Sequence, residues 1–467
     1  MEAQLDEPTS LAGSDLCALS AAEMANLVRQ RLESPVGLLR AHLERIAALD
    51  PAIGAFQVVR ADQAMAEAAA LANRDDLAQL PLAGVPVAIK DNVDVAGEPT
   101  RAGSAATSAQ PAAADDELVT RLRAAGCVVI GKTQMPELAI WPFTEPAAAP
   151  ASRNPWDRSR TPGGSTGGGA AAVAAGMAAL ALGSDGGGSI RIPAACCGLF
   201  GIKPAPGIVP LPGGRSEHWL GLSAFGPLAR TVGDAALMPD VLAGTRNYAN
   251  PRPPERPLRI AFSARHPLIG AKAVPAVRDA LEQAASLLRQ AGHELVPQSP
   301  GYPPTLGLRF NSRWLAGIAQ DAEGLDHSAL EPRTQRMARL GGRLSRRARP
   351  ASADQFARYA TEWFTRNDVL LTPTLTRGAL PVGTWDGKGW LRTMLGVANW
   401  IYTPPWNVAG LPAASVPFGR DADGLPIGIQ LVGGPGAEIT LLSLAAQIEQ
   451  LRPWPTIAPM AGASQVH

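Results

Sequence analysis

The sequence has few cysteines and no surplus of either charge. Its four cysteines, Cys17, Cys127, Cys196 and Cys197, form no C-x-x-C pair and have no histidine-rich partner segment, so neither a zinc site nor a disulfide framework is indicated. The 42 basic side chains nearly balance 41 acidic ones, for a formal net charge of +1. We therefore predict no metal, no nucleic-acid partner and no attraction to an anionic membrane.

Patterns for export and membrane insertion are missing as well. The polar start MEAQLDEPTS has neither the basic residues nor the apolar run of a signal peptide, and no segment has 18 uninterrupted apolar residues. The alanine-rich run at 170–182 is short and contains Gly176. We expect no membrane span and, from the cysteine usage, a cytoplasmic location.

Helical and strand patterns alternate along the 467 residues. Residues 20–50 predict two amphipathic helices broken near Ser34-Pro35, and residues 61–73 predict a third. A β-rich run follows at 82–97, then a helix capped by Asp115 or Asp116, and then the short strand CVVIG. Further helices are predicted near 275–291 and 438–451, and strands at 370–374 and 424–433. This alternation predicts an α/β fold, with helices on the faces of a sheet.

Two nucleotide-binding patterns lack the context they need. Residues 126–133, GCVVIGKT, fit the P-loop spacing, but the intervening residues are β-branched and apolar and are predicted to be the strand itself. Gly167-x-Gly169-x-x-Ala172 is a weak dinucleotide match without the required preceding strand. We predict no cofactor.

Ser165 lies in Gly163-Gly164-Ser165-Thr166-Gly167, which fits the G-x-S-x-G pattern of a hydrolase nucleophile. Such a serine needs a base, usually a histidine. Among the six histidines, His218 and His266 fall in loops that could reach a cleft, but nothing in the pattern pairs them with Ser165. An α/β-hydrolase with Ser165 as nucleophile and a histidine base stays open.

A second serine stands in GSDGGGSIRIP, residues 183–193. Ser189 follows Gly186, Gly187 and Gly188, whose backbone N–H groups can converge as an oxyanion hole, and it precedes an apparent helix start. A helix cap is the alternative role of Ser189. A buried lysine, whose pKa is lowered by burial, can serve as the base. Lys90, at the end of an apolar strand, is the candidate, unless it is an exposed strand-end lysine.

Six segments together resemble the amidase signature family, from about residue 38 to residue 450: PLAGVPVAIKDNVDVAG, GKTQMPELA, RNPWDRSRTPGGSTGGGAAAVAAGM, LGSDGGGSIRIPAACCGLFGIKP, GPLARTVGDAA and NVAGLPAASVPFG with GLPIGIQLVGG. The resemblance implies a large twisted mixed β-sheet flanked by helices on both faces. It also implies a single domain over residues 1–467. We divide it into N-terminal helices (1–75), a signature catalytic core (76–250), a variable helical segment on the substrate side (251–365) and a return to the core sheet with a terminal helix (366–467).

The resemblance also implies a Ser-Ser-Lys triad. Ser189 matches the acylated nucleophile, Ser165 the bridging serine after a cis peptide bond, and Lys90 the base. The N–H groups of Gly186, Gly187, Gly188 and Ser189 match the oxyanion hole. Asp185 and Arg191 match a pair that braces the glycine loop. The implied reaction is hydrolysis of amide C–N bonds through an acyl-enzyme.

The sequence departs from the family pattern at two motif positions and in one loop. Thr166 replaces a serine, and Gly186 replaces a threonine, which we expect to widen or loosen the site beside the oxyanion hole. Residues 140–150, IWPFTEPAAAP, differ from the loop of the tRNA-dependent amidotransferase subunit in this family. That function, ammonia release from glutamine for a partner enzyme, remains the alternative.

Aromatic residues give the one indication of substrate. Trp385, Trp390, Trp400 and Trp406 cluster, and Trp141 and Phe143 lie in the 140–150 loop. Core packing is their default role, but as a cleft wall they predict an aryl or apolar amide, a carbamate (urethane) or an ester. We expect a small-molecule substrate and a monomer or homodimer. Seven arginines between 333 and 349 predict a solvated helix face, with an anion or partner site as the alternative.

Overall fold

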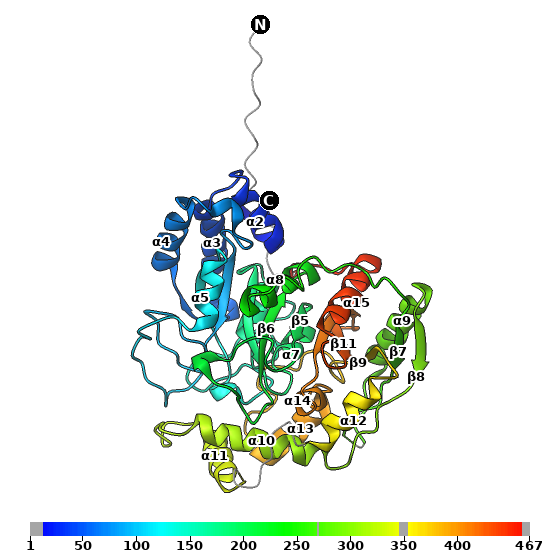
Figure 1. Cartoon of the computed structure of the whole chain (residues 1–467). Coiled ribbons are helices and arrows are strands. Elements are labelled where there is room, and N and C mark those ends of the chain that lie inside the picture. Colours follow the sequence, from blue (N-terminus) through cyan, green and yellow to red (C-terminus); the bar gives the residue numbers. More distant parts are fainter. Residues whose placement is uncertain (1–12, 269, 345–353, 460–467) are drawn as a thin grey trace.

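The computed structural model describes residues 13–268, 270–344 and 354–459. Within these residues one sheet of eleven strands runs through the molecule (Figure 1). The strands are β1 Phe56–Val59, β2 Pro86–Lys90, β3 Val128–Thr133, β4 Leu180–Asp185, β5 Phe200–Lys203, β6 Ala224–Ala229, β7 Arg259–Phe262, β8 Glu294–Pro297, β9 Val369–Pro373, β10 Ala413–Arg420 and β11 Pro426–Gly433.

The sheet is mixed, with the order β1-β3-β2-β4-β6-β5-β10-β11-β9-β7-β8. Strands β3, β2 and β4 are mutually parallel, as are β8, β7 and β9, and antiparallel pairs join these two groups through β6, β5, β10 and β11. Every residue of β2, β3, β4, β6 and β11 is buried, so both faces of the sheet must be covered there. The predicted α/β class and mixed sheet are confirmed.

Helices flank this sheet. They are α1 Gly13–Ala18, α2 Ala21–Arg29, α3 Pro35–Ile53, α4 Ala61–Ala72, α5 Glu117–Ala124, α6 Gly167–Ala174, α7 Arg191–Cys197, α8 Val232–Ala243, α9 Pro275–Gln290, α10 Leu306–Asp321, α11 Pro332–Leu344, α12 Gln355–Trp363, α13 Trp390–Trp400, α14 Pro404–Val408 and α15 Glu438–Leu451. None of the described helices is both long enough and apolar enough to cross a membrane.

The helix boundaries follow the capping residues in the sequence. The break near Ser34-Pro35 separates α2 from α3, where Ser34 caps the N-terminus by accepting from Gly37 N–H. Asp116, one of the two candidates, caps α5 by accepting from Leu118 N–H. The P-loop-like stretch, residues 126–133, begins after α5 has ended and consists mostly of strand β3, as its β-branched residues predict.

The segment 251–365, which we expect to be a variable helical segment, also contributes β7 and β8 to the sheet. Each of these strands has four residues, too few for a hydrophobic period to indicate a strand. Its helices α10, α11 and α12 lie with α13 and α14 at the end of the molecule opposite α2, α3 and α4 (Figure 1). The division into one domain with four segments stays a prediction.

Candidate active site

Lys90 is completely buried at the carboxyl end of β2, so the alternative of an exposed lysine is wrong. Its Nζ donates hydrogen bonds to Ser165 Oγ at 2.6 Å and to Ser184 Oγ at 2.8 Å. Burial lowers the pKa of Lys90 to about 7, from an ordinary value of 10.5, although the Asp185 carboxylate acts in the opposite direction. A substantial fraction of the amine is therefore neutral near pH 7 and able to accept a proton.

Ser184 and Asn92 were not expected from the sequence. Strands β2 and β4 are parallel neighbours, so their carboxyl ends lie at the same edge of the sheet and bring Ser184 to Lys90. Asn92 Nδ2 donates to Ser184 Oγ at 3.2 Å. The only signal for Ser184 was its place next to Asp185 in the GSDGGGSIRIP segment.

Ser165 follows a cis peptide bond from Gly164, as the family resemblance predicts, and its side chain is fully buried. Thr166 N–H donates to the carbonyl oxygen of Ser189 at 3.1 Å, which ties the two serine loops together. Within the described residues, however, Ser165 Oγ accepts from Lys90, and no hydrogen bond joins it to Ser189 Oγ. The structure thus forms the first link of the expected relay but not the second.

Ser189 is half-buried and lines a large cavity together with Gly187. The N–H groups of Gly188 and Ile190 donate to the two carboxylate oxygens of Asp185, at 2.7 and 3.3 Å. The Gly188 N–H is therefore already engaged. Within the described residues, the N–H groups of Gly186, Gly187 and Ser189 make no such bond.

Asp185 and Arg191 form a fully buried ion pair with two parallel hydrogen bonds of 2.9 Å. Arg191 also donates to Gln430 Oε1 at 2.7 Å and to Asn407 Oδ1 at 2.6 Å. Burial opposes ionisation of Asp185, but the Arg191 guanidinium outweighs it and holds the pKa of this carboxyl well below its usual range. Through Asp185, which accepts from Gly188 and Ile190, the pair is bonded to the glycine loop, and that it braces this loop stays a prediction. Asn407 and Gln430 are additions that sequence spacing did not indicate.

The described histidines do not pair with either serine. His218 contacts Ser223 Oγ at 2.7 Å and the Asp321 carboxylate at 3.1 Å. His266 lines the cavity but hydrogen-bonds to the backbone of Leu268. In the part of the chain that the structure describes, no histidine hydrogen-bonds to Ser165 or Ser189, so the arrangement of Ser165 with a histidine base is not formed.

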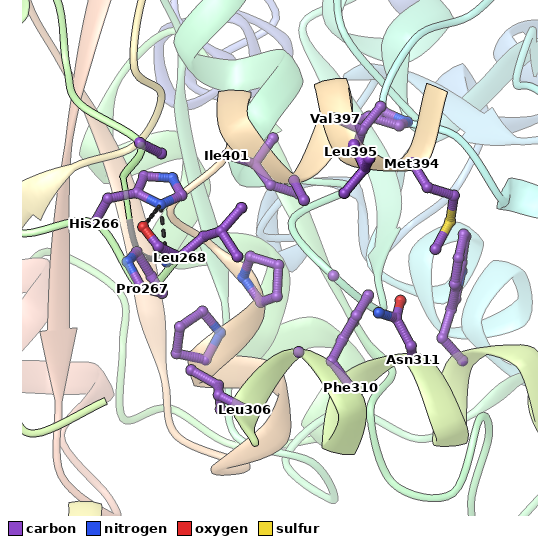
Figure 2. A pocket seen from close by; sticks show the side chains of 18 of the residues that line it. His266, Pro267, Leu268, Leu306, Phe310, Asn311, Met394, Leu395, Val397 and Ile401 are labelled. Atoms are coloured by element: carbon purple, nitrogen blue, oxygen red, sulfur yellow. Dashed lines mark hydrogen bonds between the residues drawn. The ribbon is translucent and has the colours of Figure 1, made fainter. Parts of the chain in front are cut away.

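The cavity above Ser189 has a volume of about 1050 Å³ and mainly apolar walls. Figure 2 shows Phe310 and Asn311 of α10 facing Met394 and Val397 of α13 across it. Volume and lining are those of a site for a drug-sized apolar ligand.

The aromatic cluster divides between wall and core. Trp141 and Trp390 line the cavity. Trp400 and Trp406 are buried elsewhere, and Trp385 packs on Phe143 with ring centroids 6.1 Å apart. The segment at 385–406 nevertheless supplies one wall of the cavity, through aliphatic side chains of α13 as well as Trp390.

Gly186 does not widen the site, contrary to our expectation. Trp219 occupies the room that a side chain at position 186 would need: a Cβ atom there would lie 2.6 Å from Trp219 Cε3. The departure from the family pattern is thus compensated by an indole ring that also lines the cavity.

The arginine-rich segment is partly described. In α11, Arg336, Arg339 and Arg343 are exposed, whereas Met337 and Ala338 face the core, as a solvated helix face predicts. Arg333 donates to the carbonyl oxygen of Trp385 at 2.6 Å. Arg346, Arg347 and Arg349 lie outside the described residues.

Comparison with known proteins agrees with this architecture. The sequence pattern of the Amidase family matches residues 37–442. AmiB2 of Mycobacterium tuberculosis (strain H37Rv) is 46% identical over 462 residues, covering 96% of this chain and 98% of that protein. The structure of 6-aminohexanoate cyclic dimer hydrolase has a TM-score of 0.82 at 31% identity, covering 96% of this chain and 99% of that one. A bacterial aryl acylamidase of the amidase signature family has a TM-score of 0.79 at 25% identity, covering 94% and 97%.

Fold and similarity together define a hydrolase that acts on amides. The chain belongs to the Amidase family, the amidase signature enzymes.

Proposed function

We propose that the protein hydrolyses the C–N bond of linear aryl or otherwise apolar amides, with Ser189 as nucleophile, Ser165 as relay and Lys90 as base. The observation that carries this proposal is the buried Lys90 amine 2.6 Å from Ser165 Oγ, with the Ser189 loop tied to the next residue, Thr166. A neutral, desolvated lysine can take a proton from a serine hydroxyl to which it is hydrogen-bonded.

In the proposed mechanism, protons move from Ser189 through Ser165 to Lys90. Lys90 takes a proton from Ser165, Ser165 takes one from Ser189, and Ser189 Oγ attacks the carbonyl carbon. The N–H groups of Gly186, Gly187 and Ser189 stabilise the tetrahedral oxyanion. The relay then returns a proton to the leaving nitrogen, and water hydrolyses the acyl-enzyme by the same route. The missing contact between Ser189 and Ser165 closes when the substrate orders the Ser189 hydroxyl, since catalytic hydrogen bonds often tighten only in the substrate complex.

We infer the class of substrate from the residues that line the cavity. Aromatic and aliphatic walls favour an aryl or apolar amide, and the related aryl acylamidase structure supports the same class. Carbamates (urethanes) and esters pass through the same kind of tetrahedral oxyanion, so we propose both as further substrates.

We expect kcat/KM for an anilide to exceed that for a short aliphatic amide at least about tenfold, because only the anilide buries an aryl ring in the cavity. Hydrolysis of an anilide, an aryl carbamate and a short aliphatic amide under the same conditions checks this. Equal or better activity on the aliphatic amide would contradict the apolar-substrate proposal.

We expect a serine-directed fluorophosphonate to label Ser189, because Ser189 lines the cavity whereas Ser165 is fully buried. Peptide mapping identifies the labelled residue, and Lys90→Ala should abolish labelling. Label on Ser165 instead would overturn the assignment of roles and restore the α/β-hydrolase alternative.

We expect kcat/KM to fall about tenfold per pH unit below about pH 7 and to level off above it, because only neutral Lys90 accepts a proton and its pKa is lowered to about 7. A pH–rate profile, recorded with circular dichroism to show that the fold is intact, measures this. A profile that is flat across this range would exclude Lys90 as the base.

The amidotransferase alternative predicts ammonia release from glutamine and an obligate complex. The apolar cavity and the different loop at 140–150 favour the hydrolase instead. Cytoplasmic location and a monomeric or homodimeric state stay predictions.

A further inference from the structure

Trp219 packs directly on the loop that carries Ser189. A Cβ atom on Gly186 would lie 2.6 Å from Trp219 Cε3, and one on Gly317 of α10 would collide with the indole Cδ1. Only glycine at both positions leaves room for the ring. Trp219 is 3% exposed, and what remains exposed lines the cavity.

A polar network holds the indole in place. Trp219 Nε1 donates to Asp321 Oδ2 at 2.7 Å. His218 stacks on the indole, with ring centroids 5.2 Å apart, and contacts the same carboxylate at 3.1 Å. Ser223 Oγ contacts the other ring nitrogen of His218 at 2.7 Å. The indole is thus packed against two backbones and tethered through its N–H, so it cannot give way to a bulky group.

The position of this ring decides what lies beside the reacting carbonyl. The N–H groups of Gly186 and Gly187 are free to face an oxyanion, and Trp219 covers Gly186 while Phe310 covers Gly187, where a Cβ atom would lie 2.8 Å from Phe310 Cζ. A carbonyl carbon held at this loop therefore has a rigid aromatic wall next to its acyl substituent. A branched substituent would overpack this wall.

We propose that Trp219 is a specificity-determining residue that restricts the acyl group of the substrate to unbranched or planar carbon next to the carbonyl, and that Asp321 and His218 are positioning residues that hold its ring. This rests on the proposed Ser189 mechanism. The substrate class is then an amide whose acyl group has an unbranched or planar carbon beside the carbonyl.

The test compares anilides that share one amine and differ in the acyl group, butanoyl against pivaloyl. In the wild type we expect kcat/KM for the pivaloyl compound to be at least about tenfold lower, and in Trp219→Ala we expect the two values to approach each other within about threefold. Trp363→Ala removes another buried indole, one that does not line the cavity, and it should leave the wild-type ratio unchanged.

A second comparison tests the contact with the oxyanion loop. Gly186→Ala should lower kcat/KM about tenfold or more, because the new methyl group collides with Trp219. In the Trp219→Ala background, Gly186→Ala should lower kcat/KM by less than about threefold, because the methyl group then has room. Equal losses in both backgrounds would show that Trp219 does not restrict this position.

The positioning role has its own readout. Asp321→Ala should shift the butanoyl-to-pivaloyl ratio toward that of Trp219→Ala, and Asp321→Asn, which keeps an acceptor for Trp219 Nε1, should restore it. Fluorophosphonate labelling of Ser189 is recorded in every variant. If Ser189 is not labelled in the wild type, the proposed mechanism fails. If Ser189 is labelled but the ratio is the same in Trp219→Ala as in the wild type, only the role of Trp219 is overturned.

Discussion

Replacing Ser189 with alanine is expected to lower kcat/KM by about 10⁶-fold, because the nucleophile of a covalent mechanism has no substitute. Ser165→Ala should cost about 10²- to 10⁴-fold, the range of a lost proton transfer. The roles of the two serines are distinguished by which variant loses more kcat/KM, and we expect the larger loss in Ser189→Ala. Steady-state kinetics with an anilide, read against the uncatalysed rate, measures both.

Two other buried serine hydroxyls, one remote from Lys90 and one bonded to it, extend this series. Ser415→Ala removes a buried hydroxyl that contacts Thr374 in the sheet, remote from Lys90, and should leave kcat/KM within about threefold of the wild type. Ser184→Ala removes the second hydroxyl bound to Lys90. Its loss in kcat/KM should lie between the losses of Ser415→Ala and Ser165→Ala. A larger loss in Ser165→Ala than in Ser189→Ala would mean that Ser165 is the nucleophile.

Replacing Arg191 with methionine is expected to lower the free energy of unfolding by about 3 to 5 kcal/mol, because the Asp185 carboxylate would remain buried without its counter-charge. Gln430 Oε1 and Asn407 Oδ1 would lose a donor as well. Denaturant unfolding monitored by circular dichroism measures this change.

The matched control is an exposed ion pair between neighbouring strands. Glu294→Gln breaks the pair of Glu294 with Arg259 at the surface and should change the free energy of unfolding by less than about 1 kcal/mol. Combining Asp185→Asn with Arg191→Met should cost less than the sum of the single changes, since neither charge is then left alone. A loss in Arg191→Met as small as that in Glu294→Gln would show that the buried pair does not brace the loop.

Local signals in the sequence determined the elements and most of the proposed site. Ser34 and Asp116 marked helix starts, and the apolar strand ending in Lys90 matched β2, because caps and periodicity act within a few residues. The glycine and serine segments, compared with a known family, indicated Lys90, Ser165, Ser189 and the cis peptide bond.

Contacts between residues far apart in the sequence could not be predicted from these local signals. Asn407 and Gln430 reach Arg191 from more than 200 residues along the chain, and Trp219 fills the room at Gly186 only because Gly317 of α10 lies behind it. The burial of Lys90, which makes its amine a candidate base, likewise depends on β3 and β4 at its sides. The sequence by itself determined the α/β class, the family and the chemical groups of the site. The tertiary structure decided which of those groups touch, what charge they hold and what walls the cavity has, because packing between remote segments sets distance and solvent exposure.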